Sequence, residues 1–214
     1  MHPIDESSWA RKEVYDFFSP ISNPFYSLTF PLDVTNLYRY TKERGLSFYY
    51  GLIYLCTQAV NRVENFLYTI EEGRVCLYDR RIPSFTDLEK GGELFRIVTM
   101  PCEGSMDDFC RAARAKSTAQ AGFVDYASET RDLIYFSCVP WMDITSLTNE
   151  RDLDPEDAVP RIAWGKYTEE SGRKTLHLSL EVNHRFIDGV HIGRFYEELC
   201  RLMEALGKAE IGYD

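Results

Sequence analysis

Residues 174–184, KTLHLSLEVNH, alternate between apolar and polar side chains without interruption. In an extended chain, one face would carry Leu176, Leu178, Leu180, Val182 and His184, and the opposite face His177, Ser179, Glu181 and Asn183. This period of two is that of a β-strand with one buried face. Because such a strand needs a second layer over its apolar face, we predict a layered fold in which His184 ends that face.

Further segments read as strands that are separated by turns. Two of them flank Glu71-Glu72-Gly73 and predict a β-hairpin, and a loop rich in Asp and Glu, which we expect to face solvent, separates the last two. The predicted strands are residues 66–70, 74–78, 93–101, 133–141 and 161–167.

Four segments have the periodicity of helices: residues 33–44, 48–63, 105–121 and 190–206. Asp33 is placed as the N-cap of the first helix, and Gly45 follows its end. Ser47 precedes the second segment, which is apolar nearly all round and is therefore predicted to be buried. Helices and strands are interspersed with no linker or repeat, so we expect residues 1–214 to form a single α/β domain.

Charge and composition exclude several classes of protein. Lys and Arg number 24 against 34 Asp and Glu, which gives a net charge of −10 that would repel a phosphate backbone. Hydrophobic residues at 44% and charged residues at 27% are typical of a globular domain. We therefore expect no nucleic-acid partner.

The distribution of apolar residues and cysteines bears on location. No segment approaches the roughly 20 apolar residues that span a bilayer, and the start of the chain lacks the features of a secretion signal. Six cysteines are scattered without a Cys-x-x-Cys pair, as buried free thiols are. We expect a soluble cytoplasmic protein with no membrane partner, no disulfides and no metal.

The chemistry of the chain centres on residues 183–189, NHRFIDG, which join the alternating strand to the last helix. A histidine beside Leu180 and Val182 would be partly desolvated, and this favours the neutral imidazole that accepts a proton near pH 7. The alternative is a hydrogen-bonded histidine without a chemical role, followed by a turn at Asp188-Gly189 that starts the helix. Read alone, the motif favours this alternative, because it fixes only three residues.

Several other segments give this motif a context. Read in order along nearly the whole chain, they resemble the chloramphenicol acetyltransferase family, whose fold is shared with the catalytic domain of dihydrolipoamide acyltransferases. The segments that carry the resemblance are residues 9–13, 26–28, 53–55, 58–61, 140–141, 145–146, 165–167 and the His184 motif.

The resemblance implies a two-layer α/β sandwich with a mixed sheet covered by helices, assembled as a homotrimer with active sites at the subunit interfaces. It also implies an acetyl-CoA-dependent O-acetyltransferase, with acetyl-CoA as co-substrate and chloramphenicol or a similar hydroxylated small molecule as acceptor. Acetyl-CoA and the acceptor enter from opposite ends of a tunnel, and the acetyl group passes directly between them without an acyl-enzyme.

The resemblance also assigns the residues that act on the substrates. His184 corresponds to the general base, which bonds to its own backbone, and Ser146 to the hydroxyl that stabilises the oxyanion. Asp188 and Arg11 correspond to a buried salt bridge that shapes the catalytic loop. The aromatic residues Phe17, Phe18 and Tyr26 match the acceptor-binding segment, and Lys166 and Tyr167 match positions near acetyl-CoA. Taken alone, these five side chains read equally well as packing or surface residues.

The sequence departs from the family pattern at positions that bear on activity. Asn183 replaces the first of two adjacent histidines, and Ala163 replaces a threonine near the intermediate. Residues 17–26 also differ from the usual acceptor-binding segment. Two alternatives therefore stay open: an acetyltransferase for another hydroxylated small molecule, and a catalytically inactive trimeric ligand-binding homologue.

Overall fold

Strand β10 (Arg173–Asn183) lies within the main sheet of the computed structural model, which describes residues 1–89 and 91–209. The strand order is β2-β10-β8-β7-β5-β6, with the short β9 paired to the start of β10. Pairs β5–β7 and β7–β8 are parallel and the others antiparallel, so the sheet is mixed. The other strands are β2 (Phe25–Asp33), β5 (Ile82–Leu88), β6 (Phe95–Thr99), β7 (Leu133–Val139), β8 (Arg161–Gly165) and β9 (Thr168–Glu170).

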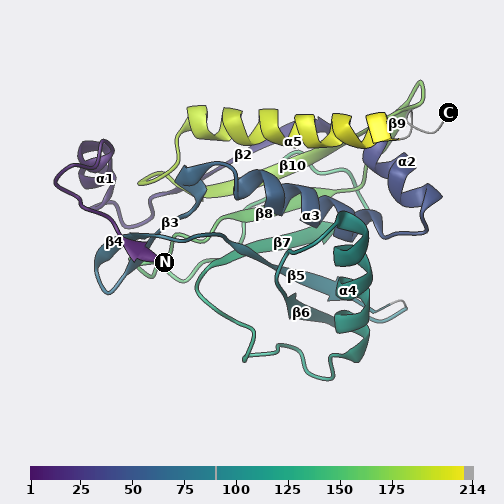
Figure 1. The fold of residues 1–214 in the computed structure, drawn as a ribbon, viewed down its shortest axis with the longest axis horizontal. Coiled ribbons are helices and arrows are strands. Elements are labelled where there is room, and N and C mark those ends of the chain that lie inside the picture. Colours follow the sequence, from purple (N-terminus) through teal and green to yellow (C-terminus); the bar gives the residue numbers. More distant parts are fainter. Residues whose placement is uncertain (90, 210–214) are drawn as a thin grey trace.

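Helices form the second layer, and Figure 1 shows α5 and α3 running across one face of the sheet. The helices are α1 (Lys12–Phe18), α2 (Thr35–Glu43), α3 (Phe48–Val60), α4 (Met106–Ala119) and α5 (Gly189–Ala209), with a 3₁₀ turn η1 (Glu64–Phe66). A small sheet pairs β1 (His2–Pro3), β4 (Arg74–Leu77) and β3 (Tyr68–Glu71). Among the described residues, no helix combines the length and the apolar character that a membrane span requires.

The two faces of the sheet differ in chemistry. Leu176, Leu178, Leu180 and Val182 have no exposed surface and pack into the core beneath the helices. Burying one such side chain contributes about 1.5–3 kcal/mol, so this face of β10 anchors the helical layer. The alternation in the sequence correctly predicts which side chains face the core.

The opposite face carries a row of polar side chains that stand side by side across six strands. The row runs through Thr99, Ser84, Tyr135, Arg161, Glu181 and Ser27 in register. Residues 142–160 cross part of this face, and Arg151 from this segment binds both Glu181 and Asp157 with its side chain only 5% exposed. The expectation that this loop faces solvent holds for most of its residues, whereas the Arg151 side chain is buried by its pairing with Glu181 in the polar row.

The local predictions succeed where a cap or a turn fixes the backbone. The hairpin β3–β4 forms, Ser47 caps α3 by accepting the Tyr50 N–H, and Gly45 after α2 has a positive φ of 63°. The cap of α2 is different: Val34 is its N-cap, and the Asp33 carboxylate accepts the Thr35 N–H. The sequence does not predict β2 and β5, because Pro31 and Pro83 interrupt their strand patterns, and it does not predict helix α1. Strand β2 tolerates Pro31 because it lies at the edge of the sheet.

Arg81 joins distant parts of the chain inside the protein. The residue is 1% exposed, and its guanidinium donates to the carbonyls of Phe66, Tyr68, Leu133 and Ala158. Burial lowers the pKa of Arg81 to about 10. This one side chain therefore ties η1 and β3 to β7 and to the segment before β8.

We expect Arg81→Met to lower the free energy of unfolding by at least about 3 kcal/mol, because several buried carbonyls lose their donor together. Urea unfolding measures the loss. The matched control is Arg80→Met, since the neighbouring Arg80 side chain is 58% exposed and its removal should change stability by less than about 0.5 kcal/mol. Equal stability of the two variants would contradict this role of Arg81.

Candidate active site

His184 begins the turn that follows β10. Its backbone N–H donates to the Pro24 carbonyl at 2.8 Å, and its side chain is 35% exposed. The ring lies 4.1 Å from the Phe18 ring and 4.5 Å from the Tyr26 ring, measured between centroids. The strand ends one residue earlier than predicted, so aromatic rings rather than an extended leucine face surround the imidazole.

The imidazole nitrogens of His184 are available for chemistry. Within residues 1–89 and 91–209, neither ring nitrogen makes a hydrogen bond, and Nε2 lies 3.5 Å from Asp188 Oδ1. The bond from the ring to its own backbone, which the family resemblance implies, does not occur in this part of the chain. The ring is therefore held by its backbone and by tilted contacts with the Phe18 and Tyr26 rings, and Nε2 faces the Asp188 carboxylate.

Arg11 holds the turn that carries His184. Its guanidinium binds both carboxylate oxygens of Asp188 at 2.6 Å and donates to the carbonyls of His184 and Arg185 at 3.1 and 2.8 Å. A planar guanidinium has the donors needed for such a bidentate contact together with further bonds. The pair therefore fixes the path of the backbone on both sides of the histidine.

The other backbone groups of residues 184–188 are also hydrogen-bonded. The Phe186 carbonyl accepts from the Asn65 side chain at 2.9 Å, and the Ile187 carbonyl accepts from the Tyr26 hydroxyl at 3.2 Å. The N–H groups of Phe186 and Ile187 donate to the Asn183 carbonyl. Because unpaired backbone groups are costly, this complete set of bonds favours one conformation of the turn.

Asn183 has a defined role in this turn. Its Oδ1 accepts from the Arg185 N–H at 2.9 Å and from Arg185 Nε at 3.1 Å, and its Nδ2 donates to the Asp157 carbonyl at 2.9 Å. The residue is 1% exposed. The amide that departs from the family pattern therefore supports the turn and links it to the loop over the polar face.

His191 is a further support that the sequence analysis missed. It is the third residue of α5, and its Nδ1 accepts the Asp188 N–H at 2.9 Å while its own N–H donates to the Asp188 carbonyl at 3.0 Å. The bond from the Asp188 N–H to the His191 side chain is one half of a capping box, with histidine in the place of Glu or Gln; the Asp188 carboxylate, which would form the other half, binds Arg11 instead. The spacing of three residues after Asp188 is the sequence signal that could have revealed it.

The charges around the turn shift its titrations. Hydrogen bonds from Arg11 hold the pKa of Asp188 below its ordinary value of 3.8. Burial, and then the positive charge of Arg11, lowers the pKa of His191 below 6.5. Burial also raises the pKa of Tyr26 to about 12, with the Asp188 charge adding to this shift. Near pH 7 the turn therefore contains an ionised Asp188, a neutral His191 and a protonated Tyr26 hydroxyl.

The three aromatic residues predicted to bind the acceptor differ in exposure and in their contact with His184. Phe18 and Tyr26 contact the His184 ring, whereas Phe17 is 71% exposed and packs edge-on against Phe18. The two predicted acetyl-CoA residues lie just after β8: Lys166 is exposed, and the Tyr167 ring contacts those of Tyr38 and Phe48.

Ser146 lies exposed in the loop that follows β7. Several contacts fasten this loop to β8 and β10: Lys166 N–H donates to the Met142 carbonyl at 2.8 Å, and His177 Nδ1 lies 2.9 Å from Asp143 Oδ1. At Gly165 a Cβ would lie 2.6 Å from the Met142 oxygen, so only glycine permits this approach. The position of Ser146 therefore depends on Gly165.

Within one chain, the structure does not bring Ser146 and His184 together. Ser179, on the polar face of β10, binds the carbonyl of Leu147 next to Ser146 at 3.0 Å. His184 lies five residues further along, which is about 16 Å of extended chain, and its ring packs on Phe18 and Tyr26 instead.

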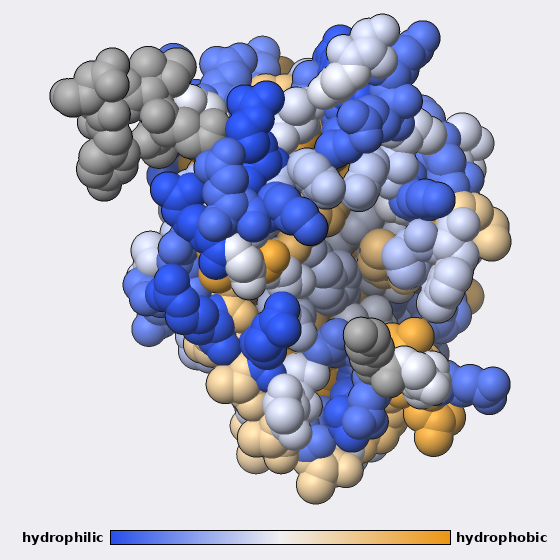
Figure 2. All heavy atoms as spheres, turned by 90° about the vertical axis from the view of Figure 1, so that its right-hand side faces the viewer, coloured by the Kyte–Doolittle hydropathy of each residue, from blue (hydrophilic) through white to orange (hydrophobic). Residues whose placement is uncertain are grey.

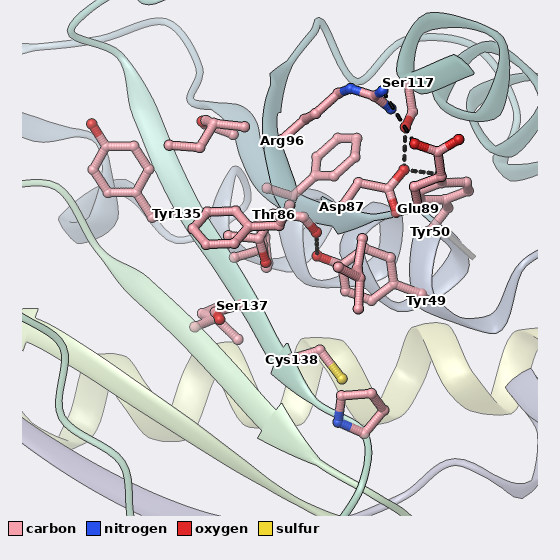
Figure 3. Close-up of a pocket in the computed structure, with 18 of the residues that line it drawn as sticks. Tyr49, Tyr50, Thr86, Asp87, Glu89, Arg96, Ser117, Tyr135, Ser137 and Cys138 are labelled. Carbon is pink, nitrogen blue, oxygen red and sulfur yellow. Dashed lines mark hydrogen bonds and ion pairs between the residues drawn. The ribbon is translucent and has the colours of Figure 1, made fainter. Parts of the chain in front are cut away.

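A cavity of about 1150 Å³ opens on the polar face over β5, β6 and β7. Pro140 and Trp141 at one end of the Ser146 loop, and Asn149 and Glu150 near its other end, line this cavity. Figure 3 shows Tyr135, Ser137 and Cys138 along β7 and, apart from them, Asp87 bonded to Tyr50 and Ser117. Among the residues that the structure describes, no group of three or more His, Cys, Asp or Glu side chains is arranged to hold a metal ion.

Comparison with known proteins identifies the family. A family model described as chloramphenicol acetyltransferase matches residues 1–200. The chain belongs to the chloramphenicol acetyltransferase family. A chloramphenicol acetyltransferase of Clostridium perfringens is 28% identical over 94% of this chain and 98% of its own length. Chloramphenicol acetyltransferase 3 of Escherichia coli is 26% identical over 92% of this chain and 95% of its own length.

Solved structures agree with the family assignment. A chloramphenicol acetyltransferase structure superposes with a TM-score of 0.85 at 27% identity, covering 95% of this chain and all of the other. The cubic core of a pyruvate dehydrogenase multienzyme complex shares the fold at a TM-score of 0.64 and 18% identity, covering 91% of this chain and 88% of its own. The predicted family, acyltransferase class and two-layer fold are confirmed.

We expect Asp188→Asn to destabilise the protein by about 2 kcal/mol at pH 7. The loss should be smaller than the roughly 3–5 kcal/mol for a fully buried pair, because the Asp188 side chain is 35% exposed. Since the folded pKa of Asp188 lies below 3.8, its contribution is present above that pH and disappears as the pH falls through the folded value. Urea unfolding should therefore show a larger difference between variant and wild type at pH 7 than near pH 3.

The control for this experiment is Asp16→Asn, which breaks the exposed i,i+4 pair with Lys12. Exposed pairs contribute little, so this variant should stay close to the wild type at both pH values. An equal effect of the two substitutions would contradict the role assigned to Asp188.

We expect His191→Leu to lower the free energy of unfolding by about 1 kcal/mol or more, because the Asp188 N–H loses its acceptor. His191→Gln supplies a side-chain oxygen at the same helical position and should restore most of this loss. Because the folded pKa of His191 is depressed, wild-type stability should fall as the pH drops below 6.5, and the Gln variant should fall less. Melting curves between about pH 5 and pH 8 test this, and identical behaviour of both variants would refute it.

Proposed function

We propose that this chain is an acetyl-CoA-dependent O-acetyltransferase that transfers the acetyl group to a hydroxyl of chloramphenicol. The observation that carries the proposal is His184, whose partly exposed ring stands on a fully hydrogen-bonded turn in a member of the chloramphenicol acetyltransferase family. We also propose that residues 1–214 act as one domain and that the protein is cytoplasmic, which its six free cysteines support.

His184 would act as the general base. A hydroxyl is a weak nucleophile until its proton leaves, and a positioned base contributes roughly 10²–10⁴-fold to the rate. The oxygen then attacks the thioester carbonyl of acetyl-CoA, the thiolate of CoA departs, and no acyl-enzyme forms. Asp188 and Arg11 would hold the turn and would not transfer the proton, since both are committed to each other.

The separation of Ser146 from His184 supports a site made by two chains of a homotrimer. His184, Phe18 and Tyr26 of one chain would face the cavity and the Ser146 loop of the next chain. The Ser146 hydroxyl would stabilise the oxyanion, and one such donor typically contributes roughly 10²–10³ in rate.

Each substrate would use its own part of this site. The cavity of about 1150 Å³ would bind the acceptor, with Phe17 at its edge and Phe18 and Tyr26 close to the base. Acetyl-CoA, a co-substrate, would approach past Lys166 and Tyr167. The mechanism that we propose uses no metal.

We expect purified wild-type protein to release free CoA thiol when supplied with acetyl-CoA and chloramphenicol. His184→Ala should lower kcat by at least about 10²-fold because the base is lost. Thiol release followed with a chromogenic disulfide, together with a melting curve for each protein, provides the measurement.

The control variant is His2→Ala, since the His2 side chain is 60% exposed and lies outside the site. This variant should keep wild-type turnover. A wild type that releases no thiol would eliminate chloramphenicol as the acceptor, and a His184→Ala protein that keeps most of its rate would eliminate the base assignment.

A further inference from the structure

The cavity has an acidic wall. Its described lining contains five carboxylate residues, Asp87, Glu89, Glu93, Glu129 and Glu150, against three arginines, Arg96, Arg114 and Arg161. The whole chain has a net charge of −10, and hydrophilic residues dominate the end of the molecule shown in Figure 2. A negative wall attracts a positively charged group more strongly than a neutral one.

Most of these charges have partners. Asp87 accepts hydrogen bonds from Tyr50 and Ser117, and Glu89 pairs with Arg96 at 3.4 Å. Arg161 donates to the Glu150 carbonyl and lies 3.8 Å from Asp157. These groups are therefore engaged within the protein.

Glu129 is different. It lies between α4 and β7, and its Oε1 contacts the hydroxyls of Ser84 and Thr99, a cross-strand pair that is 1% exposed at both positions. Within the described part of the chain, Glu129 forms no ion pair, and its second oxygen, Oε2, accepts no hydrogen bond. The carboxylate is thus oriented by two buried hydroxyls and keeps one oxygen for a ligand.

The surroundings of Glu129 suit an aromatic ligand with a hydrogen-bond donor. Tyr135 is the strand neighbour of Ser84, and burial together with the Glu129 charge raises its pKa, which keeps its hydroxyl protonated. At the rim, the rings of Phe95 and Phe123 pack 5.3 Å apart while both remain largely exposed. Aromatic walls of this kind bind flat apolar groups.

We propose that Glu129 is a specificity-determining residue that binds the protonated amine of an aromatic amino alcohol, so that cationic acceptors of this class are acetylated in addition to neutral chloramphenicol. The proposal rests on the proposed function, because it assigns the cavity to the acceptor. In this arrangement the ammonium group donates to Oε2 of Glu129, and the aromatic ring packs against Phe95 and Phe123. The hydroxyl group remains free to donate its proton to His184 of the neighbouring chain. Acetyl transfer itself proceeds as described above.

The test compares two acceptors that differ at one group. The first is chloramphenicol, and the second is the free amine that keeps its nitrophenyl ring and both hydroxyls but lacks the dichloroacetyl group. Glu129→Gln should lower kcat/KM for the amine by about tenfold or more, as for a charge-assisted hydrogen bond, and for chloramphenicol by less than about threefold. Added salt should lower the wild-type kcat/KM for the amine more than that for chloramphenicol.

The matched control is Glu204→Gln, which removes the same charge from an exposed residue of α5 that does not line the cavity. It should change neither acceptor by more than about twofold, because an exposed charge is screened. Melting curves show whether each variant is folded, and Gln at position 129 keeps an oxygen for Ser84 and Thr99. If Glu129→Gln affects both acceptors equally, or matches the Glu204 control, the proposal is wrong while the acetyltransferase activity stands.

A binding measurement separates the proposal from the activity. Calorimetry with the amine is performed on His184→Ala protein with and without Glu129→Gln. A Kd for the amine that rises about tenfold with Glu129→Gln supports the role of Glu129. If neither acceptor is acetylated, the proposed acetyltransferase function is wrong, but this binding result still stands. An unchanged Kd overturns the assignment of Glu129.

Discussion

The contact on which this structure most depends is the ion pair between Arg11 and Asp188. Arg11 precedes the first helix and Asp188 precedes the last, so one guanidinium joins the two ends of the sequence. The same group donates to the carbonyls of His184 and Arg185. Because the charge of Asp188 orients Arg11, and Arg11 in turn fixes these carbonyls, the imidazole is positioned by its backbone.

Uncharged side chains bind the backbone groups of the turn that this ion pair does not reach. Asn65, Tyr26, Asn183 and His191 satisfy the remaining groups of the turn, and they come from four separate parts of the chain. A turn bonded from so many directions has little freedom to relax when one support is lost. The entropy lost by fixing the turn is therefore lost when the protein folds and not during the reaction, as in other preorganised active sites.

The two faces of the main sheet carry different kinds of side chains. Its leucine face packs against α3 and α5, whereas its other face carries the polar row, the Ser146 loop and the cavity. His184 lies past the end of β10, whereas the residue next to Ser146 is bonded to Ser179 on the polar face of the same strand, so the two parts of the proposed site lie at different places along β10. A second chain is the simplest way to unite them.

The sequence by itself determined the β10 alternation, the hairpin, the Ser47 cap and the family, because each of these rests on residues close together or on an ordered set of motifs. It did not reveal β2 or β5, whose prolines hide the strand pattern, nor the pairing of Arg151, in the loop over residues 142–160, with Glu181 on β10. Only the tertiary structure decided that His191 and Asn65 hold the turn, that Asn183 replaces a histidine with a bonded amide, and that Glu129 meets Ser84 and Thr99. These contacts join residues far apart in sequence or depend on backbone geometry, and local periodicity carries no information about either.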